Sequence, residues 1–502
     1  MSDEFISKAS AAFADFLSEK TGKAVDKLTV AIGHDPRLSA GRISAAVVRG
    51  LALRGVNIID CSLSSTPAMF MAVLDLPCDG SVQMTASHHP GDRNGLKFFT
   101  VDGGLDSPDI AYILEKAEDI ELGDAPAQIT SCDHMKQYAA HLRSLICKGI
   151  GADEADKPLA GMRIMVDAGN GAGGFYASEV LAPLGADVSP SMNLEPDGNF
   201  PTCPYPNPEI REALQKGLDL CKTVKPDLLL ATDPDCDRVG IAVNQHGEYV
   251  LMTGNEVGIL LLNFIAQCKT ELGTMPKDPV AVTTIVSTDM VNGIAKDYGI
   301  EIRRTLTGFK YIGDQIALLE SEGHPERYLL GFEESYGYLS GGYVRDKDAV
   351  DGSMIICEMA SYYKEKGMTL VDAINVLYEK YGYYKNALCN FAFEGEDGMK
   401  KMNSIMDHLR HNAPAEIAGF KVVGDSDYQL SVRTEGAEKT EITLPKSNVL
   451  EYRLENGSKL IVRPSGTEPK IKIYLSGKGK TAAESDEIIA KMEKAATELL
   501  GL

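Results

Sequence analysis

The chain has 502 residues, which is too long for one hydrophobic core and predicts two to four domains. Hydrophobic residues (44%) and charged residues (24%) occur at the levels of an ordinary globular protein, and a formal net charge of −22 disfavours nucleic acid or an anionic membrane as a partner. Ten cysteines occur singly, without a CxxC pair, and predict reduced thiols rather than disulfides or a zinc site. The polar start and the short apolar runs predict a cytoplasmic protein without a membrane segment.

Short β-branched runs alternate with helical patterns through the first three quarters of the chain. A strand predicted at residues 28–35 leads into a helix that ends at Gly55, and the same order of elements restarts at Met162 and at Pro279. Since strand, helix and strand alternate, each unit is expected to be an α/β domain. After Tyr384 the pattern changes to antiparallel strands and a closing helix, which predicts an α+β domain.

These patterns predict an α/β fold of four domains, in which three similar α/β domains with mixed sheets precede an α+β C-terminal domain. The three α/β units share a pattern but not residue identities, so they form only a weak internal repeat. We place the four domains at 1–155, 156–270, 271–380 and 381–502.

Three carboxylates lie at alternate positions of the stretch DPDCDR, directly after an apolar run that predicts a strand. They are Asp233, Asp235 and Asp237. Like charges this close repel one another unless a cation neutralises them, and hard oxygen ligands suit Mg²⁺. An EF-hand loop also begins D-x-D-x-D, but the Gly and Glu that it requires are replaced here by Arg238 and Asn244. We therefore favour a magnesium site, with a solvated acidic turn as the alternative.

Two further stretches follow predicted strands and carry polar side chains that suit a ligand. RPSGTEPK (463–470) combines an Arg with backbone and hydroxyl donors, which is the chemistry of a phosphate clamp, although an ordinary Ser/Gly turn is an alternative. GFEESYGY (331–338) offers acceptors for sugar hydroxyls, or else is an exposed acidic turn. The mixed-charge stretch RDKDAVD (345–351) is interpreted at least as well as a salt-bridged surface turn.

A glycine-rich stretch, GNGAGG, fits the G-x-G-x-x-G fingerprint of dinucleotide-binding proteins. Gly169, Gly171 and Gly174 supply the pattern, after a strand and before a helix. The acidic residue at the expected distance, Glu195, lies in a loop rather than at the end of a second strand. A nicotinamide-dependent oxidoreductase is therefore a minor alternative.

The loop TASHHPGDRNGLKFF carries a candidate nucleophile, Ser87, beside His88 and ten residues before Lys97. A Ser–His hydrolase would need G-x-S-x-G at a strand-to-helix turn, which this loop lacks. Adjacent side chains on an extended segment point to opposite faces, so His88 is not automatically the base for Ser87. A polar loop with a helix-capping Ser remains the alternative.

Four of these stretches, TASHHP, DPDCDR, GFEESYGY and RPSGTEP, occur in this order, one in each proposed domain. In order and content they resemble the α-D-phosphohexomutase family, whose members have four domains around a central active-site cleft. The resemblance implies an intramolecular phosphotransferase that interconverts hexose 1-phosphate and hexose 6-phosphate. It also implies an active-site phosphoserine, Mg²⁺, and a hexose 1,6-bisphosphate as activator and intermediate.

The resemblance implies a role for each residue that matches the family's stretches. Catalysis would depend on Ser87 as the phosphoryl carrier, on His88, and on Lys97 as the general acid/base. The metal would be bound by Ser87, Asp233, Asp235 and Asp237. Substrate would be bound by Arg238 at the transferring phosphate, by Glu333 and Ser335 at the sugar hydroxyls, by Thr307, Gly308 and Lys310, and by Arg463, Ser465, Gly466 and Thr467 at the other phosphate.

The preferred sugar is expected to be glucose first and mannose second. The stretches FEES and TGFK resemble phosphoglucomutases and phosphopentomutases, whereas NGLKFF and the compact length resemble phosphomannomutase/phosphoglucomutases. A phosphopentomutase and a catalytically impaired phosphosugar-binding protein are the alternatives. The partner would be a small phosphosugar, with no nucleic acid or membrane, and the protein a monomer or homodimer.

Two departures from the family pattern bear on activity. The family loop usually reads TASHNP, and His89 replaces its Asn, which is expected to alter polar contacts beside Ser87 rather than to abolish activity. Family members usually begin with a strand and an Ile-Arg-Gly loop whose Arg faces the active site. The given chain opens at the following helix, so that this Arg is expected either to be missing or to precede the given start.

Overall fold

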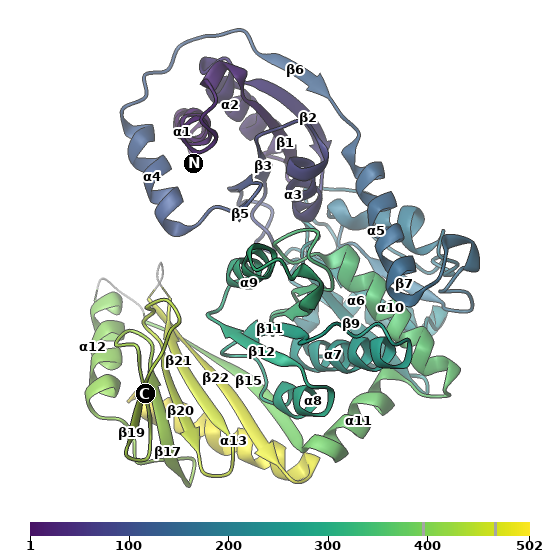
Figure 1. The fold of residues 1–502 in the computed structure, drawn as a ribbon, viewed down its shortest axis with the longest axis vertical. Coiled ribbons are helices and arrows are strands. Elements are labelled where there is room, and N and C mark those ends of the chain that lie inside the picture. Colours follow the sequence, from purple (N-terminus) through teal and green to yellow (C-terminus); the bar gives the residue numbers. More distant parts are fainter. Residues whose placement is uncertain (394–396, 466–468, 502) are drawn as a thin grey trace. The chain divides into compact units, whose positions relative to one another are not determined.

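The computed structural model describes residues 1–393, 397–465 and 469–501, with the backbone alone at 146–150 (Figure 1). The chain forms two compact units. The first is Met1–Val282 with Gly308–Ala373, and the second is Thr283–Thr307 with Ile374–Leu502. Over the described ranges, no helix combines the length and the apolar character that crossing a bilayer requires.

The first sheet of the first unit is mixed, as predicted, with the order β5-β4-β3-β1-β2-β6. Its central strand β1 pairs in parallel with β2 and β3, whereas β3, β4 and β5 pair antiparallel. The strands are β1 (Thr29–His34), β2 (Asn57–Leu63), β3 (Gly80–Met84), β4 (Leu96–Thr100), β5 (Gly103–Gly104) and β6 (Gln128–Ser131), and the helices are α1 (Asp3–Thr21), α2 (Ala40–Leu53), α3 (Thr66–Asp75) and α4 (Ser107–Glu118).

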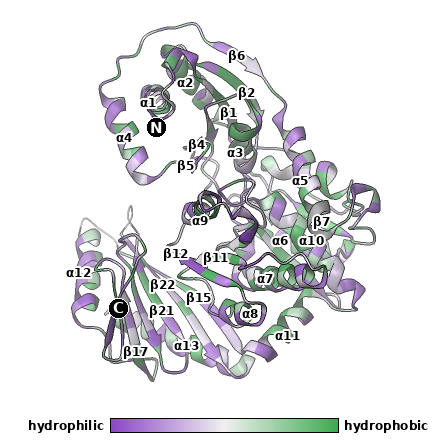
Figure 2. Cartoon of the chain, in the orientation of Figure 1, coloured by the Kyte–Doolittle hydropathy of each residue, from purple (hydrophilic) through white to green (hydrophobic). Residues whose placement is uncertain are grey.

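Helices cover both faces of this sheet, and alternate side chains of β1 pack against them on opposite faces. Val30 and Ile32 belong to the apolar cluster formed with α1, α2 and α4. Ala31 lies between them in sequence and packs instead with Met69 of α3. Figure 2 shows β1 to β3 as predominantly hydrophobic strands, which is expected of a sheet covered on both faces.

The second sheet has the order β10-β9-β8-β7, with β7 parallel to β8 and the other pairs antiparallel. Because β7 and β8 are parallel neighbours, the loops that follow them meet at one edge of the sheet. The elements are β7 (Ile164–Asp167), β8 (Leu228–Thr232), β9 (Val239–Gln245) and β10 (Glu248–Met252), with α5 (His134–Ile150), α6 (Arg211–Val224) and α7 (Gly254–Glu271).

The third sheet has the order β12-β11-β13-β14, and the boundary between the two units passes through β11. Its strands are β11 (Val280–Thr284), β12 (Glu301–Thr305), β13 (Tyr328–Phe332) and β14 (Tyr338–Leu339), and the nearby helices are α8 (Val291–Tyr298), α9 (Phe309–Ser321), α10 (Ala349–Glu365) and α11 (Leu370–Tyr381).

The C-terminal part is an antiparallel sheet with two helices, which confirms the α+β prediction. Along its main path the order is β15-β22-β21-β20-β17-β18-β19, and β16 pairs with β17. Residues of α12 and α13 join one apolar cluster with the strands. The elements are β15 (Tyr383–Ala392), β16 (Glu416–Ile417), β17 (Phe420–Asp427), β18 (Val432–Glu435), β19 (Glu438–Glu441), β20 (Leu450–Leu454), β21 (Lys459–Pro464), β22 (Lys470–Gly479), α12 (Gly398–His411) and α13 (Ala482–Leu499).

Candidate active site

Ser87 lies on the loop that joins β3 to β4, and its backbone has a φ of +52°, in the left-handed region. This conformation is uncommon for a residue with a side chain, so local contacts must hold it. Its backbone N–H donates to Thr85 Oγ1 at 2.8 Å. Its hydroxyl donates to Asp233 Oδ2 and lies near His88 Nδ1, both at 3.3 Å. The loop therefore aims the Ser87 hydroxyl at the carboxylates predicted to bind a metal.

The buried Arg37 binds the backbone of the Ser87 loop. This role was not predicted from the sequence. Its guanidinium donates to the carbonyls of Ser87 and His89 at 2.6 and 2.8 Å, and to those of Pro90 and Arg93 at 2.5 and 3.0 Å. The side chain is fully buried and pairs with Asp35, 2.9 Å away. A planar group with fixed donor directions is suited to gathering several carbonyls at once.

The three predicted carboxylates lie on the turn between β8 and β9 and are fully buried. One oxygen of each lies within 4.8 Å of the others. Asp235 Oδ1 and Asp237 Oδ1 are buried without a hydrogen-bond partner, which is costly unless a ligand completes them. Three hard oxygen ligands with unsatisfied capacity fit a divalent cation such as Mg²⁺.

Two lysines already partly neutralise the triad. Lys97 Nζ contacts Asp235 Oδ2 at 2.8 Å and Asp237 Oδ2 at 2.9 Å, and Lys347 Nζ lies 3.2 Å from Asp237 Oδ2. Burial alone would lower the pKa of Lys97, but Asp235 and Asp237 raise it well above its ordinary value. The ammonium form of Lys97 is thus held beside the Ser87 loop.

The pKa values of Asp233 and Asp237 are shifted in opposite directions. Burial raises the pKa of Asp233 well above its ordinary value, and the charges of Asp237 and Asp235 raise it further. Burial would also raise the pKa of Asp237, but Lys347, Lys97 and Arg238 lower it well below its ordinary value. The lysines therefore stabilise charge on Asp237, whereas Asp233, next to Ser87, depends on a further cation to ionise fully.

His88 and Arg238 flank the triad. Burial, with the charges of Arg238 and His89, lowers the pKa of His88 to about 4, so the imidazole is neutral at pH 7. Its ring stacks on His89, with 5.0 Å between the ring centroids. Arg238 forms ion pairs with Glu209 and, at 3.8 Å, with Asp237. A neutral imidazole thus lies beside the Ser87 hydroxyl, and the Arg238 guanidinium lies beside Asp237.

The stretch RDKDAVD is not the salt-bridged surface turn that the sequence also allowed. The Lys347 side chain is only 12% exposed and reaches Asp237 of the carboxylate triad. Asp348 is fully buried, accepts hydrogen bonds from Tyr138 and Tyr343 at 2.6 and 2.7 Å, and caps the start of α10. The density of charge in this stretch could have suggested a buried lysine, but its partner Asp237 lies more than a hundred residues away along the chain, on the turn between β8 and β9.

The glycine-rich stretch after β7 packs against the turn that carries the carboxylate triad. Ala172 N–H donates to the carbonyl of Pro234 at 2.7 Å. A side-chain carbon at Gly171 would lie 2.7 Å from Pro234 Cα, and one at Gly173 would lie 2.8 Å from Cys236 Sγ. These glycines are therefore explained by the close approach of two loops, without a dinucleotide.

The structure brings only some of the predicted sugar-binding residues into contact with one another. Glu333 is buried and accepts the Gly308 N–H at 2.8 Å, and burial raises its pKa. Ser335 lies on the same turn between β13 and β14. Lys310 pairs with Asp106 at 3.0 Å. Glu333 and Gly308 are thus brought together, and the Lys310 ammonium has a partner at the start of α4.

The remaining predicted ligands lie in the second unit. Thr307 ends one of its two segments, and Arg463 lies in β21. Ser465 N–H donates to the Lys470 carbonyl at 2.8 Å. Gly466 and Thr467 lie outside the described residues.

The structure thus places a buried acidic triad beside a loop serine at the ends of these strands. Four family models match the chain in order, described as phosphoglucomutase/phosphomannomutase alpha/beta/alpha domains I, II and III and C-terminal domain, at residues 1–123, 136–247, 253–381 and 402–495. The chain belongs to the phosphoglucomutase/phosphomannomutase family, which confirms the predicted family and its four-domain fold. The domain boundaries placed at 155, 270 and 380 stay a prediction.

One known relative agrees with this family, and two solved structures share the fold. A phosphoglucomutase of Staphylococcus aureus (strain bovine RF122 / ET3-1) is 32% identical over 482 residues, which cover 94% of this chain and 85% of the relative. A phosphoglucomutase/phosphomannomutase family protein from Burkholderia thailandensis shares the fold with a TM-score of 0.72 at 18% identity, covering 99% of this chain and 94% of that chain. The open form of the Paramecium phosphoglucomutase parafusin has a TM-score of 0.72 at 17% identity, covering 99% and 91%.

Proposed function

We propose that the enzyme interconverts hexose 1-phosphate and hexose 6-phosphate, with glucose preferred over mannose, and that Ser87 carries the phosphoryl group between them. The observation that carries this proposal is the Ser87 hydroxyl, which donates to Asp233 Oδ2 of the buried triad at 3.3 Å. A phosphoryl group on Ser87 would extend toward the triad's unpartnered oxygens, with Arg238 beside them. Carboxylates alone would repel it, so the site favours a bound divalent cation.

Mg²⁺ would be held by Asp233, Asp235 and Asp237 together with the phosphoserine, and it would stabilise negative charge on the transferring group. Arg238 offers a second, fixed positive charge for the same purpose. In the first half reaction the P–O bond to Ser87 Oγ would break as a P–O bond to the sugar hydroxyl forms, and the hydroxyl proton would end on Oγ. In the second half reaction the P–O bond to the sugar's other phosphate would break as the bond to Ser87 Oγ forms again, and the Oγ proton would end on the sugar oxygen. We assign the proton transfer of the first half reaction to Lys97, whose ammonium donates to Oγ and is restored by the hydroxyl proton.

The 1,6-bisphosphate formed in the first half reaction would turn around and return its other phosphate to Ser87. Glu333, with Ser335 on the same turn, would accept hydrogen bonds from the sugar hydroxyls. Arg463, Ser465, Gly466 and Thr467 would bind the phosphate that is not transferred. Hexose 1,6-bisphosphate would then act as the activator that phosphorylates the free enzyme.

Turnover of glucose 1-phosphate and mannose 1-phosphate, measured with Mg²⁺ and catalytic glucose 1,6-bisphosphate, tests this function. Ser87→Ala should lose about three orders of magnitude or more of turnover, since no group remains to carry the phosphoryl. Ser189→Ala, at an exposed serine, should keep full turnover. Chelation of the metal should abolish turnover and Mg²⁺ should restore it. Full activity in Ser87→Ala would exclude the proposal.

Two alternatives have distinct outcomes in the same assay. A phosphopentomutase would turn over ribose 1-phosphate faster than either hexose phosphate. A catalytically impaired phosphosugar-binding protein would bind hexose phosphates and show no turnover even with the bisphosphate. A cytoplasmic location and a monomeric or homodimeric state stay predictions, the latter open to sedimentation analysis.

A further inference from the structure

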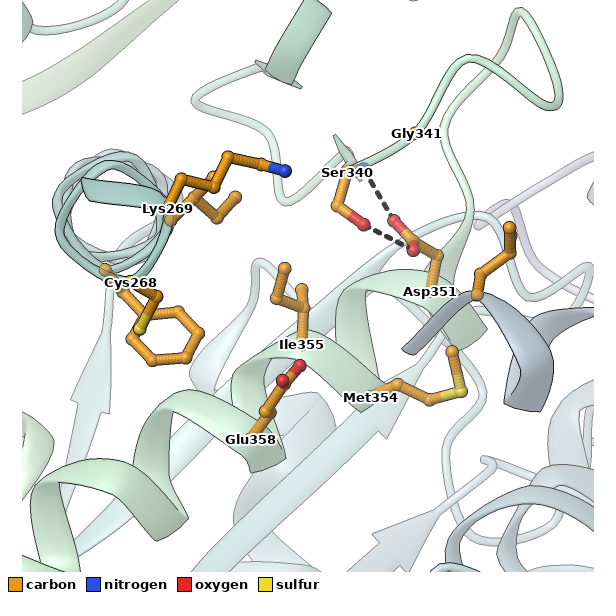
Figure 3. A pocket seen from close by; sticks show the side chains of 11 residues that line it. Cys268, Lys269, Ser340, Gly341, Asp351, Met354, Ile355 and Glu358 are labelled. Carbon is orange, nitrogen blue, oxygen red and sulfur yellow. Dashed lines mark hydrogen bonds between the residues drawn. The ribbon is translucent and has the colours of Figure 1, made fainter. Parts of the chain in front are cut away.

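A cavity of about 160 Å³ lies between α7 and α10 of the first unit, apart from the residues of the candidate active site (Figure 3). Its walls are mostly apolar. Phe264 and Ile265 line it from α7, and Met354 and Ile355 line it from α10. An apolar cavity of this size accommodates a molecule of about six heavy atoms, because a cavity of about 150 Å³ lined by apolar side chains binds benzene.

Two buried carboxyl groups of α10, Asp351 and Glu358, also line the cavity. They stand at positions i and i+7, so both lie on the helix face that the cavity borders. Asp351 is satisfied, because Ser340 donates its N–H and its hydroxyl to the two oxygens, each at 2.7 Å. Glu358 is only 8% exposed, and its Oε1 has no hydrogen-bond partner. Figure 3 shows its carboxyl group pointing from α10 toward the space between the helices.

No cation of the described residues pairs with Glu358. Lys269 of α7 lines the same cavity, and Figure 3 shows its side chain extending toward Ser340 instead. Burial, and then the charge of Asp351, raises the pKa of Glu358 to about 8. A buried acid with a free oxygen and a raised pKa is poised to gain from a cationic ligand, because that ligand would replace both the missing hydrogen bond and the missing counter-charge.

The chemistry of the cavity walls favours an organic cation over a metal ion as the ligand. A hard divalent ion needs about six oxygen ligands, and around Glu358 the cavity offers aliphatic and aromatic carbons instead. Both oxygens of Asp351 are already engaged by Ser340. An ammonium group on a short apolar body matches both the free carboxyl oxygen and the walls.

We propose that this cavity is a binding site for a small primary amine, whose ammonium group donates to Glu358 Oε1 and whose hydrocarbon part packs between Phe264 and Ile355. The site is independent of the proposed mutase function, since none of its residues belongs to the catalytic or metal-binding set. The ligand class is an alkyl- or arylammonium of about five to seven heavy atoms.

Binding of n-pentylammonium, followed by saturation-transfer NMR at pH 8, tests the site. The amine should bind at least about tenfold more tightly than 1-pentanol, which has the same body without the charge. Glu358→Gln should weaken amine binding about tenfold or more and leave pentanol unaffected. Lys269→Met should strengthen it, because a like charge leaves the cavity wall. Equal binding of amine and alcohol, unweakened amine binding in Glu358→Gln, or weaker amine binding in Lys269→Met would overturn the proposal.

A steric variant keeps the test decisive if Glu358→Gln does not fold. Ile355 is half-buried on the cavity wall, and Ile355→Phe should fill the space while leaving the charge. Amine binding should then disappear although thermal unfolding is unchanged. Binding that persists in Ile355→Phe would place the amine elsewhere and exclude this cavity.

Discussion

At the scale of single residues, the site depends on side chains that hold others in place as much as on those that react. Ser87 has a strained backbone, and four carbonyls of its loop region converge on Arg37. The strain is therefore maintained by a buried guanidinium rather than by the loop alone. Ser87 and Asp233 were predictable because each lies in a distinctive local stretch. Arg37 was not, because its partners lie some fifty residues away along the chain.

Arg37→Lys should lower kcat about ten- to a hundredfold, because one ammonium cannot reach the same set of carbonyls and the Ser87 hydroxyl will be misplaced. The substrate's KM should change little, since Arg37 is buried behind the loop. Steady-state kinetics with glucose 1-phosphate measure both. Arg42→Lys, at an exposed ion pair, is the matched control. A fall in stability with kcat intact would assign Arg37 to folding alone.

Glu358→Gln should make the melting temperature less dependent on pH. The pKa of Glu358 is raised to about 8 in the folded state, so the protein holds this proton more tightly than the unfolded chain does. The stability that the protonated acid contributes is full below the unfolded value near 4.5 and is lost as pH rises toward 8. Asp351 of α10 and Cys268 and Lys269 of α7 are the ionisable groups that face the same cavity.

The variant should therefore match the parent near pH 5 and melt about 2 °C or more above it near pH 9. Thermal unfolding followed by circular dichroism across this pH range measures the difference. A constant difference at all pH values would show that Glu358 does not titrate in the folded state.

At the scale of elements, the turn that carries the carboxylate triad is shaped by the loop that follows β7. The loops after β7 and β8 meet at one sheet edge because these strands are parallel, and Ala172 donates to Pro234 across the contact. The sequence showed the glycines but not their purpose, since a G-x-G-x-x-G pattern after a strand is also what a dinucleotide requires. Lys347 was hidden for a similar reason, because only the fold brings its stretch to Asp237.

Gly171→Ala should displace the metal-binding turn, because the added carbon would lie 2.7 Å from Pro234 Cα and 2.8 Å from its carbonyl oxygen. We expect a loss of about 1–3 kcal/mol in stability and weaker activation by Mg²⁺. Gly41→Ala is the matched control, since nothing lies within 4 Å of a side-chain carbon there. It should be neutral or stabilise α2 by up to about 1 kcal/mol. Magnesium titrations of activity that coincide for the two variants would contradict this account.

At the scale of the whole molecule, the alternation of strands and helices was enough to predict the fold class and the C-terminal change to antiparallel strands. The order of four short stretches was enough to predict the family, which the four matched models confirm. The cavity beside Glu358 was beyond prediction, because it arises where helices distant in sequence pack together. Whether a charged side chain such as Glu358 is buried depends on tertiary packing, so it could not be predicted from the sequence alone.

The central claim is that Ser87 is the phosphoryl carrier, and peptide mass spectrometry after incubation with glucose 1,6-bisphosphate and Mg²⁺ tests it most directly. One phosphoryl group should appear on the peptide containing Ser87 and should leave when excess glucose 1-phosphate is added. Ser87→Ala should acquire none. A phosphoryl group on another residue that turns over with substrate, or turnover without any phosphorylated enzyme, would contradict the account.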